Sequence, residues 1–168
     1  MTAIRLERPE DRAAIRRVHE AAFGQPDEAD LVDALRAAGD LVPELCLIAE
    51  RGGAVIGHIA FSRGRLEGGA EVLALAPVGV LPEHQGEGAG SALNRAGLER
   101  AAQTGFPLVV VLGHAGYYPR FGFEPAAALG VIAPFDVPDE NWMALRLPAY
   151  RANARGTVRY ADAFGVVT

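Results

Sequence analysis

The first part of the chain carries apolar residues first at strand-like and then at helix-like spacing. Thr2–Leu6 predicts a short strand. Pro9-Glu10-Asp11 predicts the start of a helix, because proline suits the first helical position and acids there complement the helix dipole. A second helix is predicted for Asp27–Ala38. The expected buried stripes are Ile15, Val18 and Ala22 in the first helix, and Leu31, Ala34, Leu35 and Ala38 in the second.

Two strand-length apolar runs follow, at Leu45–Glu50 and Ala54–Ser62. Only Arg51-Gly52-Gly53 separates them, and so short a glycine-containing connection predicts a tight hairpin. Cys46, the only cysteine, falls in the first run. We interpret it as a small buried hydrophobic residue, and no intramolecular disulfide can form.

The longest strand predicted from the pattern is Ala70–Leu81. Pro77 and Gly79 interrupt it, and both favour a bulge, since proline cannot donate to a strand ladder. A bulged strand that parts from its neighbour leaves backbone groups free and opens a wedge beside them. We therefore expect an opening along the second half of this strand.

A strand–helix–strand unit closes the central part of the chain. Residues 91 to about 104 have helical spacing, and Leu108–Leu112 is a continuous apolar run, as expected for a parallel strand buried on both faces. The unit should be right-handed, with its ligand outside the carboxyl ends of the strands. We expect one α/β domain over residues 1–168, with a core of about 2–147 and a C-terminal extension at 148–168. Further strands are predicted at Phe123–Ala126, Val131–Ile132 and Trp142–Leu147.

Composition narrows the class of protein. The 168 residues are half apolar and 22% charged, as in an ordinary globular domain. The net charge of −5 and the absence of any basic tract argue against a nucleic-acid partner. No apolar stretch approaches a membrane span, and residues 1–8 lack the hydrophobic region of a signal peptide, so we expect a cytoplasmic protein with no membrane partner.

The glycine-rich stretch Gln85–Ser91 lies between the interrupted strand and the next helix. Such a turn is suited to an anionic group, because backbone N–H groups and the helix dipole meet there without side chains in the way. A Walker-type phosphate loop is excluded, since the chain has no lysine. A dinucleotide G-x-G-x-x-G pattern fails as well, because its third glycine would fall on Ser91 or Leu93.

Two motifs together resemble the GNAT N-acetyltransferase superfamily. Gln85-x-x-Gly88-x-Gly90, after Val80-x-Pro82, is similar to its acetyl-CoA pyrophosphate loop. Tyr118-Pro119-Arg120-Phe121-Gly122-Phe123 is similar to its Tyr-x-x-x-Gly-Phe segment, and the order of elements matches over roughly Ile4–Leu147. The resemblance implies a mixed central sheet, flanked by helices, in which a bulged strand splays from a parallel neighbour. It also implies transfer of the acetyl group of acetyl-CoA to a primary amine of a small molecule or peptide.

The resemblance further implies roles for individual residues. Val78 and Val80 would offer backbone groups to the pantetheine arm, and Tyr118 would protonate the leaving sulfur. Arg95 or Arg120 would reach the adenosine phosphate, and no metal is implied. The backbone N–H groups expected to hold the pyrophosphate belong to the segment that contains Gln85, Gly86, Gly88, Ala89, Gly90 and Ser91.

Several alternatives stay open from the sequence. Tyr118 could be only a packed aromatic residue. No general base is specified: Ala74 stands where some protein-acetylating relatives carry a glutamate, and His114 could relay a proton or only cap a turn. His58, inside a strand, is interpreted as structural. The acids at the start of the second helix, Asp27, Glu28, Asp30 and Asp33, form either a solvated helix face or a lip that attracts a cationic amine.

Rival functions also stay open. A non-catalytic acyl-CoA sensor on the same fold would keep the glycine loop, and a phosphate-binding fold unrelated to CoA would bind no CoA at all. The acceptor should be selected by Phe23–Ala38 and Ala127–Pro138, which carry no decisive motif. A homodimer is possible if edge strands near Trp142–Leu147 pair between subunits.

Overall fold

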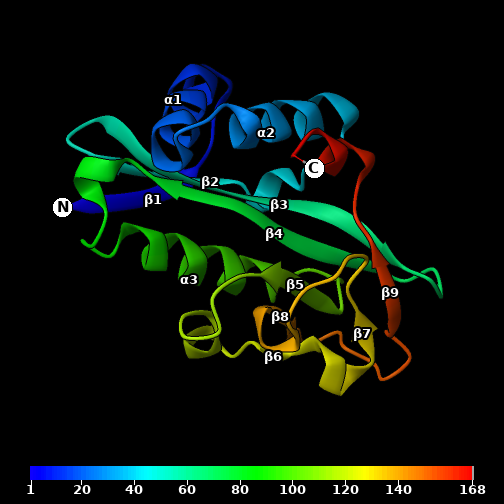
Figure 1. Cartoon of the computed structure of the whole chain (residues 1–168). Coiled ribbons are helices and arrows are strands. Elements are labelled where there is room, and N and C mark those ends of the chain that lie inside the picture. The colour runs from blue at the N-terminus through cyan, green and yellow to red at the C-terminus, as the bar shows by residue number, and fades with distance from the viewer. Residues whose placement is uncertain (168) are drawn as a thin grey trace. The chain divides into compact units, whose positions relative to one another are not determined.

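A computed structural model gives the structure of the chain and describes residues 1–167. These residues form two compact units, shown in the ribbon of Figure 1 and described here in turn. The strands β3 (Ala54–Leu66) and β4 (Glu71–Val80) contribute residues to both. Unit 1 comprises Met1–Ser62, Ala76–Arg100 and residues 162–167, and unit 2 comprises Arg63–Leu75 and Ala101–Ala161.

Unit 1 is built on strands hydrogen-bonded in the order β1-β2-β3-β4. β1 pairs antiparallel with β2, and β2 pairs antiparallel with β3. Gly52 and Gly53 both have positive φ, which confirms the predicted tight turn between β2 and β3. The longest strand is β3 with 13 residues, not β4 with 10, so the prediction on this point was wrong. The strands are β1 (Thr2–Leu6), β2 (Leu47–Arg51), β3 (Ala54–Leu66) and β4 (Glu71–Val80).

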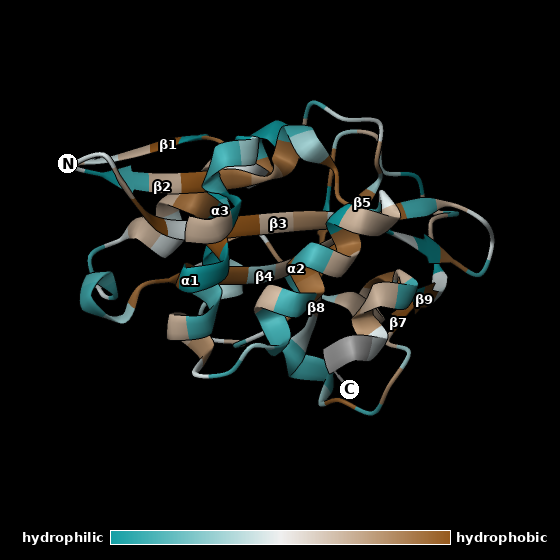
Figure 2. Ribbon diagram, turned by 90° about the horizontal axis from the view of Figure 1, so that it is seen from above, coloured by the Kyte–Doolittle hydropathy of each residue, from teal (hydrophilic) through white to brown (hydrophobic). Residues whose placement is uncertain are grey.

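Two helices cover one face of these strands and a third covers the other (Figure 1). In Figure 2, β3 is largely hydrophobic, whereas the outer surfaces of the first two helices carry hydrophilic residues. The predicted stripe of the second helix was partly wrong, because Ala38 is exposed, while Ala29 and Val32 are buried. The stripe of the first helix omitted His19, which is buried. The helices are α1 (Arg12–Phe23), α2 (Asp27–Ala38) and α3 (Ala89–Ala101).

Unit 2 has strands in the order β4-β5-β8-β6. β5 pairs parallel with β4, whereas β8 pairs antiparallel with both β5 and β6. Because β8 has a strand on each side, the edge strand near Trp142–Leu147 is β6 and not β8 itself. β5 is buried over its first four residues, but Leu112 is 50% exposed, so burial on both faces does not extend to its end. The strands are β5 (Leu108–Leu112), β6 (Glu124–Pro125), β7 (Val131–Ile132) and β8 (Trp142–Arg146).

The tail after residue 147 adds a strand that the sequence pattern did not predict. β9 (Gly156–Arg159) pairs antiparallel with the end of β3 and parallel with β7. Ala154 and Val158 are buried in the same hydrophobic cluster as Val110 and Trp142. The tail therefore completes the core of unit 2.

Candidate active site

The second half of β4 extends beyond its parallel partner. The β4–β5 register pairs Leu73 with Val109 and Ala74 with Val110, whereas β4 itself continues to Val80. Val78 and Val80, the residues expected to face the pantetheine arm, lie in this continuation and are half-buried. The bulge at Pro77 and Gly79 stays a prediction.

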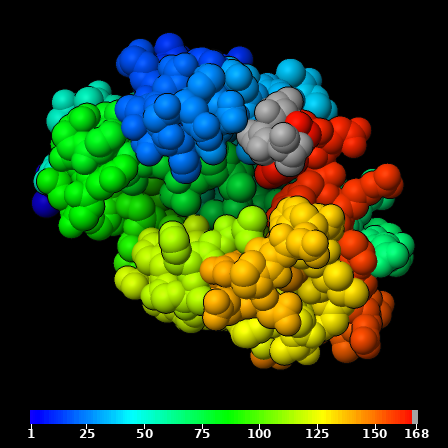
Figure 3. Space-filling view, viewed as in Figure 1, coloured from blue at the N-terminus to red at the C-terminus, as the bar shows by residue number. Residues whose placement is uncertain are grey.

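The glycine-rich loop leads from β4 into the N-terminus of α3. Gly86 and Gly88 have φ of 81° and 92°, a conformation that favours glycine. No heavy atom lies within 4 Å of where a Cβ would stand on either residue, so conformation and not space requires glycine there. Ala92 donates to the Gly88 carbonyl at 3.0 Å, while the earlier N–H groups of the first turn point outward along the helix axis. Figure 3 shows this green segment at the surface.

Side-chain hydrogen bonds and an ion pair within unit 1 connect the loop to β4 and β2. The Gln85 side-chain amide donates to the Val80 carbonyl at 3.0 Å. Arg51, at the end of β2, forms an ion pair with Glu87, and His84 Nδ1 lies 3.2 Å from the same carboxylate. The hydrogen bonds from His84 and then from Arg51 hold the pKa of Glu87 below its usual value. The acid of the loop is therefore paired with the Arg51 guanidinium and hydrogen-bonded to His84.

Tyr118, in unit 2, begins a 3-10 turn that ends at Phe121. Its ring packs edge-on against Tyr117 and Phe123 at centroid distances of 5.1 and 5.6 Å. Gly113 lies against the ring, and a Cβ there would stand 2.7 Å from Tyr118 Cδ2. The residue is 8% exposed, and burial, followed by the charge of Tyr117, raises the pKa of Tyr118 to about 12. Its phenol stays protonated near neutral pH, as a proton donor requires.

The other predicted residues of unit 2 take local roles. The His114 carbonyl accepts hydrogen bonds from the N–H groups of Tyr117 and Tyr118 at 3.0 and 3.3 Å, so its backbone forms the turn, while the residue is exposed. The Arg120 guanidinium lies 4.6 Å from the centre of the Tyr117 ring and donates to the Tyr117 carbonyl. These contacts hold Arg120 within its own turn.

Comparison with known proteins gives the family. The model described as the acetyltransferase (GNAT) family matches residues 12–123. The chain belongs to the GNAT acetyltransferase family. It is 42% identical over 159 residues to the uncharacterized N-acetyltransferase YjhQ of Escherichia coli K12, covering 90% of this chain and 88% of YjhQ.

Solved structures agree with this assignment. YhbS of Escherichia coli, a GNAT family N-acetyltransferase crystallised with CoA, superposes with a TM-score of 0.90 at 32% identity, covering 98% of this chain and 92% of YhbS. A GNAT family acetyltransferase from Brucella melitensis, crystallised with acetyl-CoA, gives a TM-score of 0.81 at 39% identity over 98% of both chains. The predicted GNAT fold is thereby confirmed.

The structure also bears on two alternatives that the sequence left open. Position 74, on β4, is a buried alanine, so it supplies no carboxylate as a general base. In the acidic face of α2, Asp30 and Asp33 pair with Arg16, at 2.7 and 2.9 Å, which favours a solvated, internally paired surface.

Among residues 1–167, no group of three or more His, Cys, Asp or Glu side chains could hold a metal ion. Within the same residues, every helix is too short or too polar to span a membrane.

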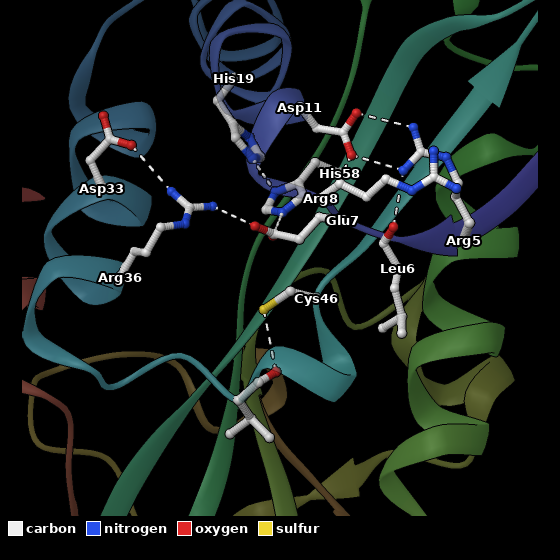
Figure 4. Close-up of polar contacts among 11 residues, drawn as sticks. Arg5, Leu6, Glu7, Arg8, Asp11, His19, Asp33, Arg36, Cys46 and His58 are labelled. Carbon is white, nitrogen blue, oxygen red and sulfur yellow. Dashed lines mark hydrogen bonds and ion pairs between the residues drawn. The ribbon is translucent and has the colours of Figure 1, made fainter.

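The sequence reasoning missed a buried polar chain in unit 1. His19 of α1 and His58 of β3 are both fully buried, with His19 Nε2 only 2.9 Å from His58 Nδ1. His58 was expected to be structural, and His19 was not singled out. The sequence offered one signal that His19 (Figure 4) could be buried: it follows Val18, which belongs to the predicted apolar stripe of the first helix.

Proposed function

We propose that this GNAT protein is an N-acetyltransferase that transfers the acetyl group of acetyl-CoA to a primary amine of a small molecule or peptide by direct attack. The observation that carries the proposal is the loop with left-handed Gly86 and Gly88 at the N-terminus of α3. A backbone of this shape presents several N–H groups to one anion, and the helix dipole adds partial positive charge. The CoA and acetyl-CoA in the related YhbS and Brucella structures support the choice of anion.

On the cofactor side, backbone N–H groups within Gln85–Ser91 hold the pyrophosphate, other than that of Gln85, which donates to the Pro82 carbonyl at 3.3 Å. Since Glu87 is paired with Arg51 and His84, the charge of the only acid within this segment is offset by neighbouring groups. Val78 and Val80 offer backbone groups to the pantetheine arm. The Val80 carbonyl already accepts from Gln85, and it retains a second lone pair for a ligand.

The reaction forms a bond between the amine nitrogen and the acetyl carbon and breaks the bond from that carbon to sulfur. The amine, protonated in water at neutral pH, must lose its protons, and the CoA thiolate must gain one. Tyr118 gives its phenolic proton to the sulfur. Because burial raises the pKa of Tyr118 to about 12, the donor is in its protonated form at the start of each turnover.

One experiment tests the loop, with CoA binding measured by calorimetry. Gly88→Ala places a methyl group in the open space beside the loop and strains a left-handed backbone. Gly39→Ala is the matched control, because Gly39 caps α2 in unit 1, also has positive φ (76°) and has equally open surroundings. We expect similar losses of stability in both variants, but a loss of CoA affinity of about tenfold or more only in Gly88→Ala. Equal CoA affinity in the two variants would overturn the assignment of the loop.

A second experiment tests catalysis. The protein is mixed with acetyl-CoA and one of four amines, propylamine, spermidine, glycinamide or a peptide with an N-terminal alanine, and free thiol is followed. Thiol release that depends on an amine and falls in Tyr118→Phe supports the proposal. CoA binding without thiol release from any amine would favour an acyl-CoA sensor, and no CoA binding at all would favour an unrelated phosphate-binding protein.

A further inference from the structure

The ring of Tyr118 lies against the glycine that follows β5. A Cβ built on Gly113 would stand 2.7 Å from Tyr118 Cδ2 and 3.4 Å from Cζ, and it would stand closest of all to Cε2. Cζ is the carbon that bears the phenol hydroxyl, so Gly113 lies against the edge of the ring that ends in this hydroxyl. The contact requires glycine at position 113, and any movement of this glycine passes directly to the phenol.

Glycine leaves the backbone at this position with little restraint of its own. β5 ends at Leu112, where its ladder with β8 also ends, and its last registered pair with β4 is Val110 with Ala74. Gly113 follows these pairs and lies outside regular secondary structure. Because glycine has the widest range of backbone conformations, a strand that leads into glycine needs contacts from elsewhere to hold the direction of the chain.

One residue, Asn141, binds both polar backbone groups of Gly113. The Gly113 N–H donates to the Asn141 backbone carbonyl, and the Asn141 side-chain amide donates to the Gly113 carbonyl, both at 3.0 Å. Asparagine suits this task, because its short side chain carries N–H groups that can reach the same residue as its own backbone carbonyl. The two hydrogen bonds hold Gly113 in place and in direction, as a further pair of the ladder would.

Asn141 is itself anchored to the core of unit 2. It ends the 3-10 helix η6 (Asp139–Asn141), and its N–H donates to the Pro138 carbonyl at 2.9 Å. The next residue, Trp142, begins β8, is only 3% exposed and donates from Nε1 to the Val131 carbonyl at 3.1 Å. The amide of Asn141 is therefore presented from a fixed, buried part of the sheet.

We propose that Asn141 is a positioning residue that, through Gly113, fixes the phenol of Tyr118 for protonation of the leaving sulfur. This inference rests on the proposed function, in which Tyr118 supplies that proton. Asn141 transfers no proton itself. Without its amide N–H, Gly113 loses one of its two restraints, and the ring against it can leave the position that the reaction needs. A misplacement of a reacting group by about 1 Å can lower the rate about 10²-fold.

The first test observes the ring directly. The protein is labelled with carbon-13 in its tyrosine rings, and the Tyr118 signals are assigned with Tyr118→Phe. The edge-on rings of Tyr117 and Phe123 shift these signals by an amount that depends on geometry. Asn141→Asp should change the Tyr118 signals, because a carboxylate oxygen would face the Gly113 carbonyl at the 3.0 Å separation of the present hydrogen bond. Unchanged signals would overturn the proposal without reference to any activity.

Asn153→Asp is the matched control. It makes the same chemical change at an exposed asparagine of unit 2, so the Tyr118 signals and the rate should stay as in the wild type. A control that disturbs the Tyr118 signals as much as Asn141→Asp would overturn the proposal. If Asn141→Asp does not fold, Asn141→Ala carries the same expectations, because it removes the amide without adding a charge.

The second test asks whether Asn141 affects catalysis through the phenol. The rate constant kcat for acetyl transfer is measured in the wild type, Asn141→Asp, Tyr118→Phe and the double variant. We expect Asn141→Asp to lower kcat about tenfold or more in the wild type. It should have little further effect in Tyr118→Phe, where no phenol is left to be positioned. CoA affinity should change little, because the substitution alters none of the residues proposed to hold the pyrophosphate.

The outcomes separate this role from the proposed function. An equal loss of kcat in both backgrounds would show that Asn141 acts independently of the phenol, and it would overturn the positioning role while the proposed function stood. Full activity of Asn141→Asp would have the same consequence. A wild-type protein that acetylates none of the four amines would overturn the proposed function and this role together.

Discussion

Replacing Gly113 by alanine tests whether the position of Tyr118 controls the reaction. The new Cβ would stand 2.7 Å from Tyr118 Cδ2 and still closer to Cε2. An ordinary contact of 3.4 Å requires a movement of about 0.7 Å at Cδ2 and of more at Cε2, so the ring or the backbone must move by about 1 Å. The backbone cannot easily retreat, because Gly113 N–H donates to the Asn141 carbonyl and the Asn141 amide donates to the Gly113 carbonyl, both at 3.0 Å. The ring must therefore yield.

The expected size of the effect follows from this displacement. Overpacking of this kind costs about 1–3 kcal/mol of the free energy of unfolding. Misplacing a reacting group by about 1 Å can lower the rate about 10²-fold. If Tyr118 protonates the sulfur, Gly113→Ala should lower kcat by about this factor. CoA affinity should change little, because Gly113→Ala alters none of the residues proposed to hold the pyrophosphate.

The assay combines thiol release from acetyl-CoA, calorimetric CoA binding and urea denaturation. Gly116→Ala is the control: it lies three residues along the same segment, and a Cβ there would meet no atom within 4 Å. Its free energy of unfolding should stay within about 0.5 kcal/mol of wild type, and its rate should be retained. The reasoning is refuted if Gly113→Ala keeps full activity, or if Gly116→Ala is impaired to the same extent.

Three further predictions concern Tyr118, His19 and Arg51. Tyr118→Phe should lower kcat about 10²-fold or more without changing CoA affinity. In the wild type, ionisation of this phenol should cause no loss of rate up to about pH 11, because its pKa is raised to about 12, and thiol release between pH 7 and 10.5 checks this. For His19, whose pKa falls from 6.5 to about 3 on folding, the unfolded chain binds the extra proton below pH 6.5. The free energy of unfolding should therefore fall on acidification, by about 2 kcal/mol between pH 6.5 and 5. Urea denaturation should show that His19→Gln removes this dependence of stability on pH. His114→Gln, at an exposed histidine, should keep it. Arg51→Met should leave Glu87 less well paired and weaken CoA binding severalfold at low salt, with a smaller difference at high salt.

The local features of this protein could be predicted because they depend on neighbours in sequence. Gly52-Gly53 between two apolar runs specified a hairpin, and both glycines have the positive φ that such a turn needs. Gly86 and Gly88 before a helical pattern predicted a glycine turn on the same grounds, and both have positive φ. The spacing of apolar residues gave the bounds of α2 directly.

Features that depend on distant partners could not be predicted in this way. The interior place of β8 is decided by pairing with β5 and β6, and no periodicity within a single strand reveals how many neighbours it has. β9 was missed because Val158 is its only buried residue, and the strand forms by pairing with the end of β3 and with β7, both distant in sequence.

By itself, the sequence determined most of the elements, the glycine loop and the family, because each is encoded in short-range spacing and in residue types that suit one backbone shape. The tertiary structure alone decided which residues surround His19. His58 lies 39 positions away along the chain, and only the packing of α1 against the strands brings the two rings within hydrogen-bond distance and sets Nδ1 against Gly79. From the sequence, Gly79 was only an interruption in a strand. In the structure, it is the residue that makes room for a buried imidazole.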